Sequence, residues 1–381
     1  MKKRHRFFYW LLRPPVIAFL KWKFGYTYEK PKQLPDHYLV ISNHVTDYDM
    51  LMVGASFSRQ MYFVGSEHIA RWKRLYPLLR YAFAPILRHK GASAAASVLE
   101  ILRCLRRGHN VCLFAEGVRS WDGRTSPILP SSAKLVKTAG CGLVTYKIKG
   151  GYFASPMWCG AKTRRGYVHG APVHVYTPEQ LKQMSDEEVY AAITGDLAED
   201  AYAAQMENPR RYRGKRLAEG LENLLFLCPS CGAEDSFAAS GDHVHCRNCS
   251  LSFRYTEEGM LEGAPYTTVR DFADWQKQQV SALAEQEYIC SVPQAELFCV
   301  ESHRAECVAK GELEMTPDAL RCGEMEFPLA QIGQLAMHGQ RILVFMCDHH
   351  YYELVVADGG NALKFMWFFN CYQIQLQEKV G

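Results

Sequence analysis

The sequence predicts an α/β domain with a mixed sheet flanked by helices, a small zinc ribbon, and a C-terminal β-rich domain closed by a helix. Short apolar runs alternate with helical periods up to about residue 176, two Cys-x2-Cys pairs follow, and strand-length segments fill the chain after residue 285. With 381 residues, 48% of them hydrophobic, the chain has the composition of a globular protein and room for two or three domains. Disordered and fibrous classes are excluded.

Residues 1–36 are predicted to form interfacial membrane-anchoring helices. Basic side chains at positions 2 to 6 precede the apolar residues 7–12, and a second apolar run covers residues 16–20. Arg13-Pro14-Pro15 splits these runs and no small-residue cleavage site follows, so we interpret the segment as retained and not as a signal peptide. Basic side chains can meet anionic headgroups while aromatic ones enter the acyl boundary. The alternative is a helix packed on the protein's own core.

Charge is unevenly divided along the chain. Residues 1–170 contain 28 basic and 8 acidic side chains, whereas residues 171–381 contain 16 and 32. A basic first half suits an anionic membrane surface and phosphate-bearing substrates. Fourteen cysteines in a chain without an export signal indicate a reducing compartment. No run reaches the roughly 20 apolar residues of a transmembrane helix, so we expect a peripheral or monotopic protein on the cytoplasmic face of the membrane.

Residues 37–216 are expected to form the α/β domain. Predicted strands cover residues 38–42, 61–64, 110–115, 143–149 and 167–176, and predicted helices cover residues 48–57, 67–87, 93–107 and 132–139. The second of these helices should bend near Pro77 and Pro85. Capping boxes at Thr177 and Ser185 indicate a further helical segment, with a break near Gly195 and an end at residues 208–209.

The C-terminal region, residues 285–381, is expected to be β-rich. Strands are predicted over residues 295–300, 311–315, 341–346 and 351–356, before an apolar helix over residues 362–375. This order resembles a pleckstrin-homology-like domain, without a residue motif that specifies it. A helical linker, residues 261–284, is expected to precede it.

A His-Asp pair lies where the first strand of the α/β domain gives way to a helix. The sequence Asn43-His44-x4-Asp49 places the two side chains five residues apart. A carboxylate can fix the imidazole tautomer through one ring nitrogen while the other nitrogen takes a proton from a hydroxyl. By itself the pair is a weak signal, because a histidine at a strand end is more often structural.

A second motif follows the next-but-one predicted strand. Phe114-Ala115-Glu116-Gly117-Val118-Arg119-Ser120 supplies a carboxylate, a turn glycine and a guanidinium. Arginine can bind a phosphate through two parallel hydrogen bonds, and ligands of α/β sheets bind at the carboxyl ends of the strands. Glu116 also has a simpler interpretation, as a partner of Arg119 or a turn cap.

Together these motifs resemble the two signature blocks of the glycerolipid acyltransferase family, of the lysophosphatidic-acid acyltransferase type, over roughly residues 10–215. The resemblance implies transfer of a fatty acyl group from acyl-CoA or acyl-carrier protein to a lysophospholipid hydroxyl. The first acceptor to consider is 1-acyl-sn-glycerol 3-phosphate, which would give phosphatidic acid. His44 would then be the general base, oriented by Asp49. The implied substrate-binding residues are Asn43, Arg88, Glu116, Gly117 and Arg119, and Arg88 is the best match to a phosphate-facing arginine between the blocks.

Departures from the family pattern leave the acceptor open. Ala115 and Val118 replace the usual Pro and Thr, and Thr145 stands where Pro is common. One alternative is an acyltransferase that acts on another lysolipid or on an amino-acid-based lipid. The other is a non-catalytic lipid-binding scaffold, which would need neither the base nor its orienting carboxylate.

Residues 217–260 are expected to form a zinc ribbon. Two Cys-x2-Cys pairs, separated by 14 residues, can complete a closed tetrahedral Zn²⁺ shell; they are Cys228, Cys231, Cys246 and Cys249. Such a site would be structural, while an iron centre or redox thiols are the alternatives. Some zinc ribbons bind nucleic acid, but this segment is acidic and nucleic-acid affinity depends on phosphate contacts. We therefore expect domain bracing or partner binding and no nucleic-acid partner.

Overall fold

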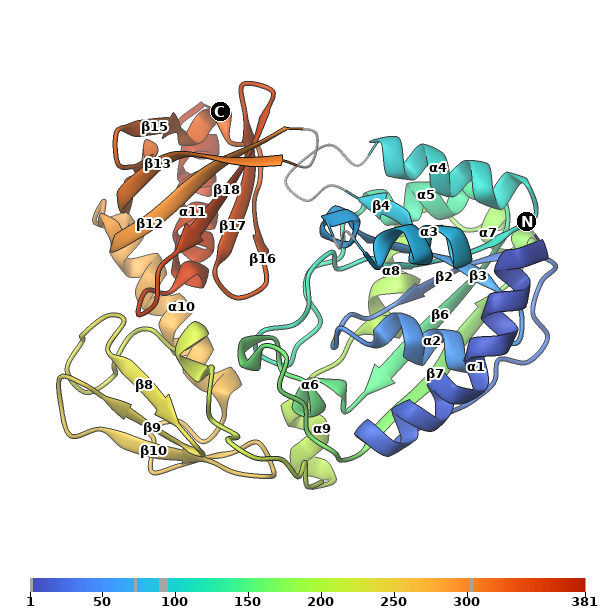
Figure 1. Cartoon of the computed structure of the whole chain (residues 1–381), viewed down its shortest axis with the longest axis horizontal. Helices are drawn as coiled ribbons and strands as arrows, with labels where there is room; N and C mark the ends of the chain where they lie inside the picture. The colour runs from blue at the N-terminus through green and yellow to red at the C-terminus, as the bar shows by residue number, and fades with distance from the viewer. Residues whose placement is uncertain (1–2, 72–73, 89–94, 302–303, 381) are drawn as a thin grey trace. The chain divides into compact units, whose positions relative to one another are not determined.

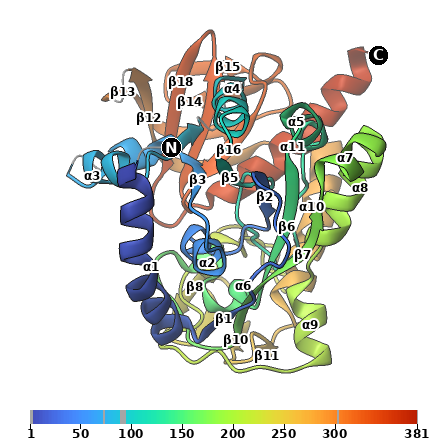
Figure 2. The same ribbon diagram turned by 90° about the vertical axis from the view of Figure 1, so that its right-hand side faces the viewer.

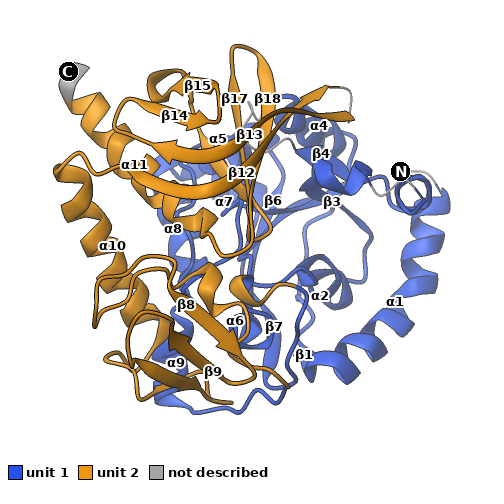
Figure 3. Ribbon diagram, turned by 60° about the vertical axis from the view of Figure 1, so that its left-hand side comes forward, with its two compact units in different colours: residues 1–89, 93–157, 161–214 blue, residues 90–92, 158–160, 215–381 orange. Residues whose placement is uncertain are grey.

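A computed structural model describes residues 3–71, 74–88, 95–301 and 304–380 of the chain. The chain divides into two compact units, coloured separately in Figure 3. Unit 1 comprises residues 1–89, 93–157 and 161–214, and unit 2 comprises residues 90–92, 158–160 and 215–381. The division near residue 214 falls close to the end of the α/β domain expected from the sequence.

Unit 1 is built on a seven-stranded mixed sheet in the order β1-β7-β6-β2-β5-β3-β4 (Figure 1). The strands are β1 (Tyr26–Tyr28), β2 (Tyr38–Ser42), β3 (Met61–Ser66), β4 (Ile86–Arg88), β5 (Asn110–Phe114), β6 (Gly142–Lys149) and β7 (Val168–Tyr176). Neighbouring strands are parallel except β6 and β7, which are antiparallel. The mixed sheet is as predicted, and β1 extends it into the segment expected to form only the anchor.

Helices cover both faces of this sheet. They are α1 (Lys3–Phe24), α2 (Asp49–Ser56), α3 (Tyr76–Ala82), α4 (Ala95–Arg106), α5 (Ser131–Ala139), α6 (Gly151–Ala154), α7 (Pro178–Gln183), α8 (Asp186–Leu197) and α9 (Ala201–Glu207). On central strand β2, Leu39 and Ile41 join the apolar core formed with α4, α5 and α8. Tyr38 alternates to the other face and packs on Phe57 at the end of α2. Figure 2 shows α1 and α2 on one side of the sheet and α7 and α8 on the other.

Three helical predictions were wrong in detail. In place of one long helix over residues 67–87, the described residues form a short 3-10 turn (Glu67–Arg71), α3 and β4, and residues 86–88 of β4 pair with β3. The N-terminal segment is one helix, with Pro14 and Pro15 inside it. Gly195 lies within α8; the breaks fall where Ser185 and Asp200 cap the following helices through their side chains.

Helix α1 has one packed and one exposed face. The Tyr9 hydroxyl donates to the carbonyls of Gly54 and Phe57, and Arg13 donates to that of Ala55, so α1 is fixed to α2. Large apolar side chains remain exposed on the other face: Phe7, Trp10, Leu11, Leu12, Phe19 and Trp22. Across the described part of the chain, no helix has the length and apolarity to cross a membrane.

Unit 2 begins with a four-stranded antiparallel sheet in the order β11-β10-β9-β8. Its strands are β8 (Phe237–Ser240), β9 (His243–Cys246), β10 (Ser252–Tyr255) and β11 (Leu261–Glu262). Strand β11 therefore lies within the expected linker, and the linker helix α10 (Val269–Glu285) begins only after Thr268 caps it. Phe237, Phe253 and Phe272 pack against one another and join the sheet to α10.

The rest of unit 2 is a seven-stranded antiparallel sheet closed by a helix, as predicted. The sheet order is β15-β14-β13-β12-β18-β17-β16. Its elements are β12 (Cys290–Glu301), β13 (Arg304–Met315), β14 (Ala319–Cys322), β15 (Met325–Pro328), β16 (Leu335–His338), β17 (Ile342–Cys347), β18 (His350–Val356) and α11 (Ala362–Val380). Buried Lys364 of α11 forms ion pairs with Glu234 at 3.1 Å and Asp235 at 2.6 Å, which joins this helix to the cysteine-bearing segment.

Candidate active site

His44 lies in the loop between β2 and α2, with its ring held on two sides. Its Nδ1 is 2.9 Å from Asp49 Oδ2, and the ring stacks on Phe114 with centroids 4.7 Å apart. The His44 side chain is 25% exposed, whereas that of Asp49 is only 1% exposed. Because Nδ1 faces the carboxylate, Nε2 is the nitrogen placed to take a proton from a hydroxyl. The predicted pair therefore has the geometry of a base and its orienting group.

Asp49, the first residue of α2, is held by the loop that it helps to form. Its Oδ2 accepts from the backbone N–H of Val45 at 2.7 Å, and its Oδ1 accepts from the Thr46 hydroxyl at 2.7 Å. The Thr46 backbone N–H also donates to the carboxylate at 3.0 Å. These bonds leave the carboxylate one orientation, and this orientation fixes the imidazole ring.

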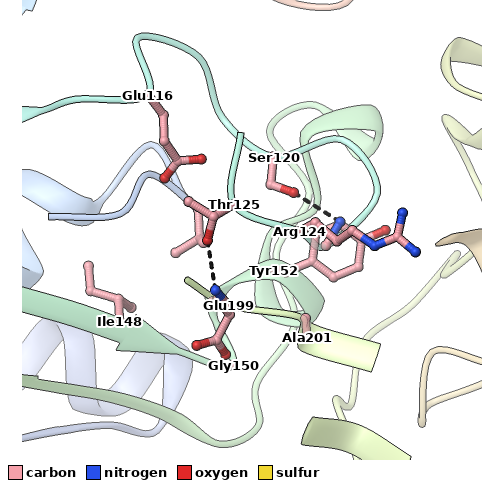
Figure 4. A pocket seen from close by; sticks show the side chains of 12 residues that line it. Glu116, Ser120, Arg124, Thr125, Ile148, Gly150, Tyr152, Glu199 and Ala201 are labelled. Carbon is pink, nitrogen blue, oxygen red and sulfur yellow. Dashed lines mark hydrogen bonds between the residues drawn. The ribbon is translucent and has the colours of Figure 1, made fainter. Parts of the chain in front are cut away.

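Glu116 supports His44 through its backbone. One carboxylate oxygen accepts from the His44 N–H at 2.7 Å and the other accepts from the Ser126 N–H at 2.6 Å. Burial raises the pKa of Glu116 to about 8, although these two N–H groups favour the carboxylate. Figure 4 shows Glu116 on the wall of a small cavity that is also lined by Thr125 and Glu199. Glu116 thus braces the His44 loop through backbone N–H groups, and both its oxygens are used by the protein. Arg119 bonds instead to Val45, Ser155 and Asp47.

Arg119, expected to contact phosphate, is 5% exposed and bonded to the His44 loop. Its Nε and Nη2 each lie 3.3 Å from the Val45 carbonyl oxygen, and Nη2 also donates to the carbonyl and hydroxyl of Ser155. Its Nη1 lies 2.9 Å from Oδ2 of Asp47, a side chain that is 65% exposed. A phosphate could therefore reach Arg119 at Nη1 by displacing Asp47, while the other donors position the loop.

Asn43, also expected to bind substrate, is fully buried and bonded to β6. Its Nδ2 donates to the Ile148 carbonyl at 2.9 Å, and its Oδ1 accepts from the Ile148 N–H at 2.8 Å. The whole amide is therefore used to fasten the end of β2 to β6. In this structure Asn43 positions its neighbour His44 instead of facing a substrate.

Arg88, at the end of β4, lies beside the second motif. A Cβ built on Gly117 would lie 3.1 Å from Arg88 Nη1, and Gly117 has a φ of +71°. Any larger residue at position 117 would therefore meet both a strained backbone and the guanidinium. The Arg88 Nε is buried, and no described residue bonds to it. Arg119 makes several hydrogen bonds within the protein, whereas the buried Nε of Arg88 makes none to a described residue.

An apolar cavity of about 280 Å³ extends from this region between α4 and α5. Arg88 and Phe114 both line it, and Phe114 is the residue on which the His44 ring stacks. Its other lining residues are mainly apolar and include Val98, Ile101, Leu102, Leu113, Leu129 and Leu135. The sequence did not predict this cavity, because its walls come from residues spread over some seventy positions of the chain.

In unit 2 the four predicted cysteines converge. The sulfurs of Cys228 and Cys249 are 3.7 Å apart, those of Cys231 and Cys246 are 3.8 Å apart, and all four lie within 4.8 Å of one another. Tetrahedral ligands at the usual Zn–S distance of about 2.3 Å are separated by about 3.8 Å. The donor set and its spacing therefore fit a structural Zn²⁺ ion.

Part of the chain is similar to known proteins. Residues 25–149 match the family model described as Acyltransferase. The chain is similar to the crystal structure of the 1-acyl-sn-glycerophosphate (LPA) acyltransferase PlsC from Thermotoga maritima, with 16% identity and a TM-score of 0.44 over 55% of this chain and 84% of that one. It is also similar to the solution structure of the N-terminal PH domain of human ARAP2, with 10% identity and a TM-score of 0.19 over 23% and 81% of the two chains. No curated protein matches the sequence.

Proposed function

We propose that this chain, whose residues 25–149 match the acyltransferase family model, transfers a fatty acyl group from an acyl thioester to the free hydroxyl of a lysophospholipid. The donor would be acyl-CoA or acyl-carrier protein, and the first acceptor to test is 1-acyl-sn-glycerol 3-phosphate, which would give phosphatidic acid. The observation that carries the proposal is the accessible His44 ring, which buried Asp49 holds in place. Beside it lie an apolar cavity and Arg88, whose buried Nε has no partner among the described residues.

The proposed chemistry needs one base and no covalent enzyme intermediate. Nε2 of His44 accepts the proton of the acceptor hydroxyl while the hydroxyl oxygen attacks the carbonyl carbon of the thioester. The tetrahedral intermediate collapses, the C–S bond breaks, and the thiolate takes the proton back from the imidazolium. Asp49 holds Nδ1–H and stabilises the imidazolium while the proton is on the ring.

Arg88 is the residue we expect to bind the acceptor phosphate. Replacing it with glutamine should raise the KM for 1-acyl-sn-glycerol 3-phosphate by about 10- to 100-fold, since a charge-assisted hydrogen bond is worth about 1.5–3 kcal/mol. The KM for a neutral monoacylglycerol should stay nearly unchanged. Labelled acyl-CoA offered with a panel of lysolipids measures both values. Arg103→Gln is the matched control, because Arg103 is an exposed arginine of α4.

The same panel separates the candidate functions. Transfer to 1-acyl-sn-glycerol 3-phosphate supports the proposal, and transfer only to another lysolipid supports the alternative acceptor. Lipid binding without turnover, by protein that has kept its fold, would leave the non-catalytic scaffold as the remaining explanation. An equal rise in KM for charged and neutral acceptors would contradict the role of Arg88.

The cavity between α4 and α5 is proposed to take the acyl chain. Leu102, which lines it from α4, is buried, so Leu102→Trp should shorten the space. We expect kcat/KM for a 16-carbon acyl donor to fall at least about tenfold relative to that for an 8-carbon donor. Leu99→Trp is the control, since Leu99 is an exposed residue of the same helix. A proportional loss for both donors would argue against the cavity as the acyl site.

The exposed apolar face of α1 is proposed to meet an anionic membrane. Trp10 and Trp22 are among its most exposed aromatic residues, and Lys21 and Lys23 lie in the last turn of the helix. The full chain should co-sediment with vesicles that contain phosphatidylglycerol, and Trp10→Glu with Trp22→Glu should reduce this binding about tenfold or more. Unchanged binding of the double variant would contradict the proposal.

A further inference from the structure

We propose that the C-terminal sheet carries a second metal site, open to solvent, formed by Cys299, Glu301 and His350. These side chains offer one thiol sulfur, one carboxylate oxygen and one imidazole nitrogen, and the three ligand atoms lie within 4.8 Å of one another. Zn²⁺ accepts this combination of sulfur, nitrogen and oxygen ligands, and three protein ligands with a water complete its usual tetrahedron. The site lies apart from the four-cysteine cluster and from the acyltransferase residues in the sequence.

Strand pairing brings the three ligands together. Cys299 and Glu301 are two residues apart on β12, so their side chains share one face of the sheet. Val300 pairs with Tyr351 of β18, which places Glu301 beside His350. His350 Nδ1 and Glu301 Oε1 are 3.6 Å apart, too far for a good hydrogen bond. This distance is close to the separation of about 3.3 Å between two ligands on a tetrahedral Zn²⁺ with bonds of about 2.0–2.1 Å.

A tight turn fixes the third ligand. Asp348 and His349 connect β17 to β18, and both have positive φ, +48° and +65°. Two consecutive left-handed residues are typical of a two-residue hairpin turn, in which the flanking residues are paired. Cys347 and His350 form that pair, so His350 is held at the first position of β18. The turn thereby holds the backbone of His350 in place, and the imidazole lies 3.6 Å from the Glu301 carboxylate before any ion binds.

Charged side chains of both signs neighbour the three ligands. Glu306 of β13 pairs with Cys299 of β12, so a second carboxylate neighbours the thiol, and Arg304 of β13 pairs with Glu301. A divalent ion would offset the charges of a thiolate and the nearby carboxylates. Cys299 is half-buried, whereas Glu301 and His350 are exposed, so water can reach the ion. The ion should therefore exchange more readily than one enclosed by four cysteines.

Zinc stoichiometry of the full chain tests the second site. In equilibrium dialysis against buffer with a fixed concentration of free Zn²⁺, the unmodified chain should bind two equivalents, and the Cys299→Ser and His350→Ala variants should each bind one. Cys307→Ser is the matched control, because Cys307 is an exposed thiol on β13 outside the cluster. It should bind two equivalents. With Co²⁺ in place of Zn²⁺, the absorption spectrum of the unmodified chain minus that of Cys299→Ser should show a charge-transfer band from a single thiolate.

Affinity provides an independent measurement. Glu301→Gln should weaken Zn²⁺ binding at the second site at least about tenfold and leave the first equivalent unaffected. One equivalent in the unmodified chain, or two in both Cys299→Ser and His350→Ala, would overturn the proposal. Loss of an equivalent in Cys307→Ser as well would indicate nonspecific thiol binding and would also overturn it. Circular dichroism of each variant establishes that the sheet remains folded.

Discussion

Replacing His44 with alanine is expected to lower kcat by about 10²- to 10⁴-fold while the protein stays folded. The variant removes the group that accepts the hydroxyl proton, but it keeps the loop backbone. In the variant, the backbone N–H at position 44 can still donate to Glu116, and the backbone N–H groups of Val45 and Thr46 can still donate to Asp49. Single-turnover acyl transfer measures the loss, and thermal unfolding checks the fold.

His174→Ala is the matched control for this experiment. His174 Nδ1 lies 2.6 Å from Asp196 Oδ1, and its side chain is 60% exposed, so it is a second accessible histidine with a carboxylate partner on the same sheet. Removing the His174 imidazole should leave kcat within about twofold of that of the unmodified chain, because His174 lies outside the motifs around His44. Near-normal turnover by His44→Ala, or equal losses in both variants, would remove the basis for assigning the base.

Replacing Cys246 with serine is expected to remove one tightly bound zinc and to unfold the four-stranded sheet of unit 2. Structural zinc contributes about 10–16 kcal/mol of apparent binding energy in small zinc-dependent folds, because ligand binding and folding are coupled. Cys246 is the last residue of β9, so losing its thiolate affects both the metal shell and the strand. Metal analysis and hydrogen exchange of residues 228–262 measure the two effects.

His245→Ala distinguishes a four-cysteine shell from one that includes histidine. His245 precedes Cys246 on the same strand but is exposed, on the opposite face of β9. This variant should keep its zinc and its protection from exchange. Loss of zinc from His245→Ala, or unchanged zinc in Cys246→Ser, would contradict the closed shell.

The sequence was most informative where the interacting residues are close along the chain. His44 and Asp49 belong to one loop, and the cysteines come as two pairs within 22 residues. Short loops leave few alternative geometries, so the motif alone predicted both clusters and both are present. The resemblance to acyltransferases is confirmed over residues 25–149, which match the acyltransferase family model, while the lysophosphatidic-acid type stays a prediction. The catalytic role of His44 and the phosphate role of Arg88 stay predictions.

Roles that depend on distant partners could not be read from the motifs. Asn43 bonds to Ile148, 105 positions away, and Glu116 bonds to His44, 72 positions away. From the sequence alone, the Glu116 carboxylate and the Asn43 amide could equally well contact a substrate or form hydrogen bonds that hold the loop in place. Only the pairing of β2 with β5 and β6 shows that their donors and acceptors are used within the protein.

The amino-acid order alone thus determined the chemistry available: an imidazole with its carboxylate, two arginines, and four thiols at metal-binding spacing. Tertiary structure decided which of these groups is still available to a ligand. Most donors of Arg119 are bonded to Val45 and Ser155, and only its Nη1, paired with exposed Asp47, faces a displaceable partner, whereas Arg88 lies at an apolar cavity between α4 and α5. The reason is physical: a buried polar group must find partners, and strand order, not local sequence, brings those partners near.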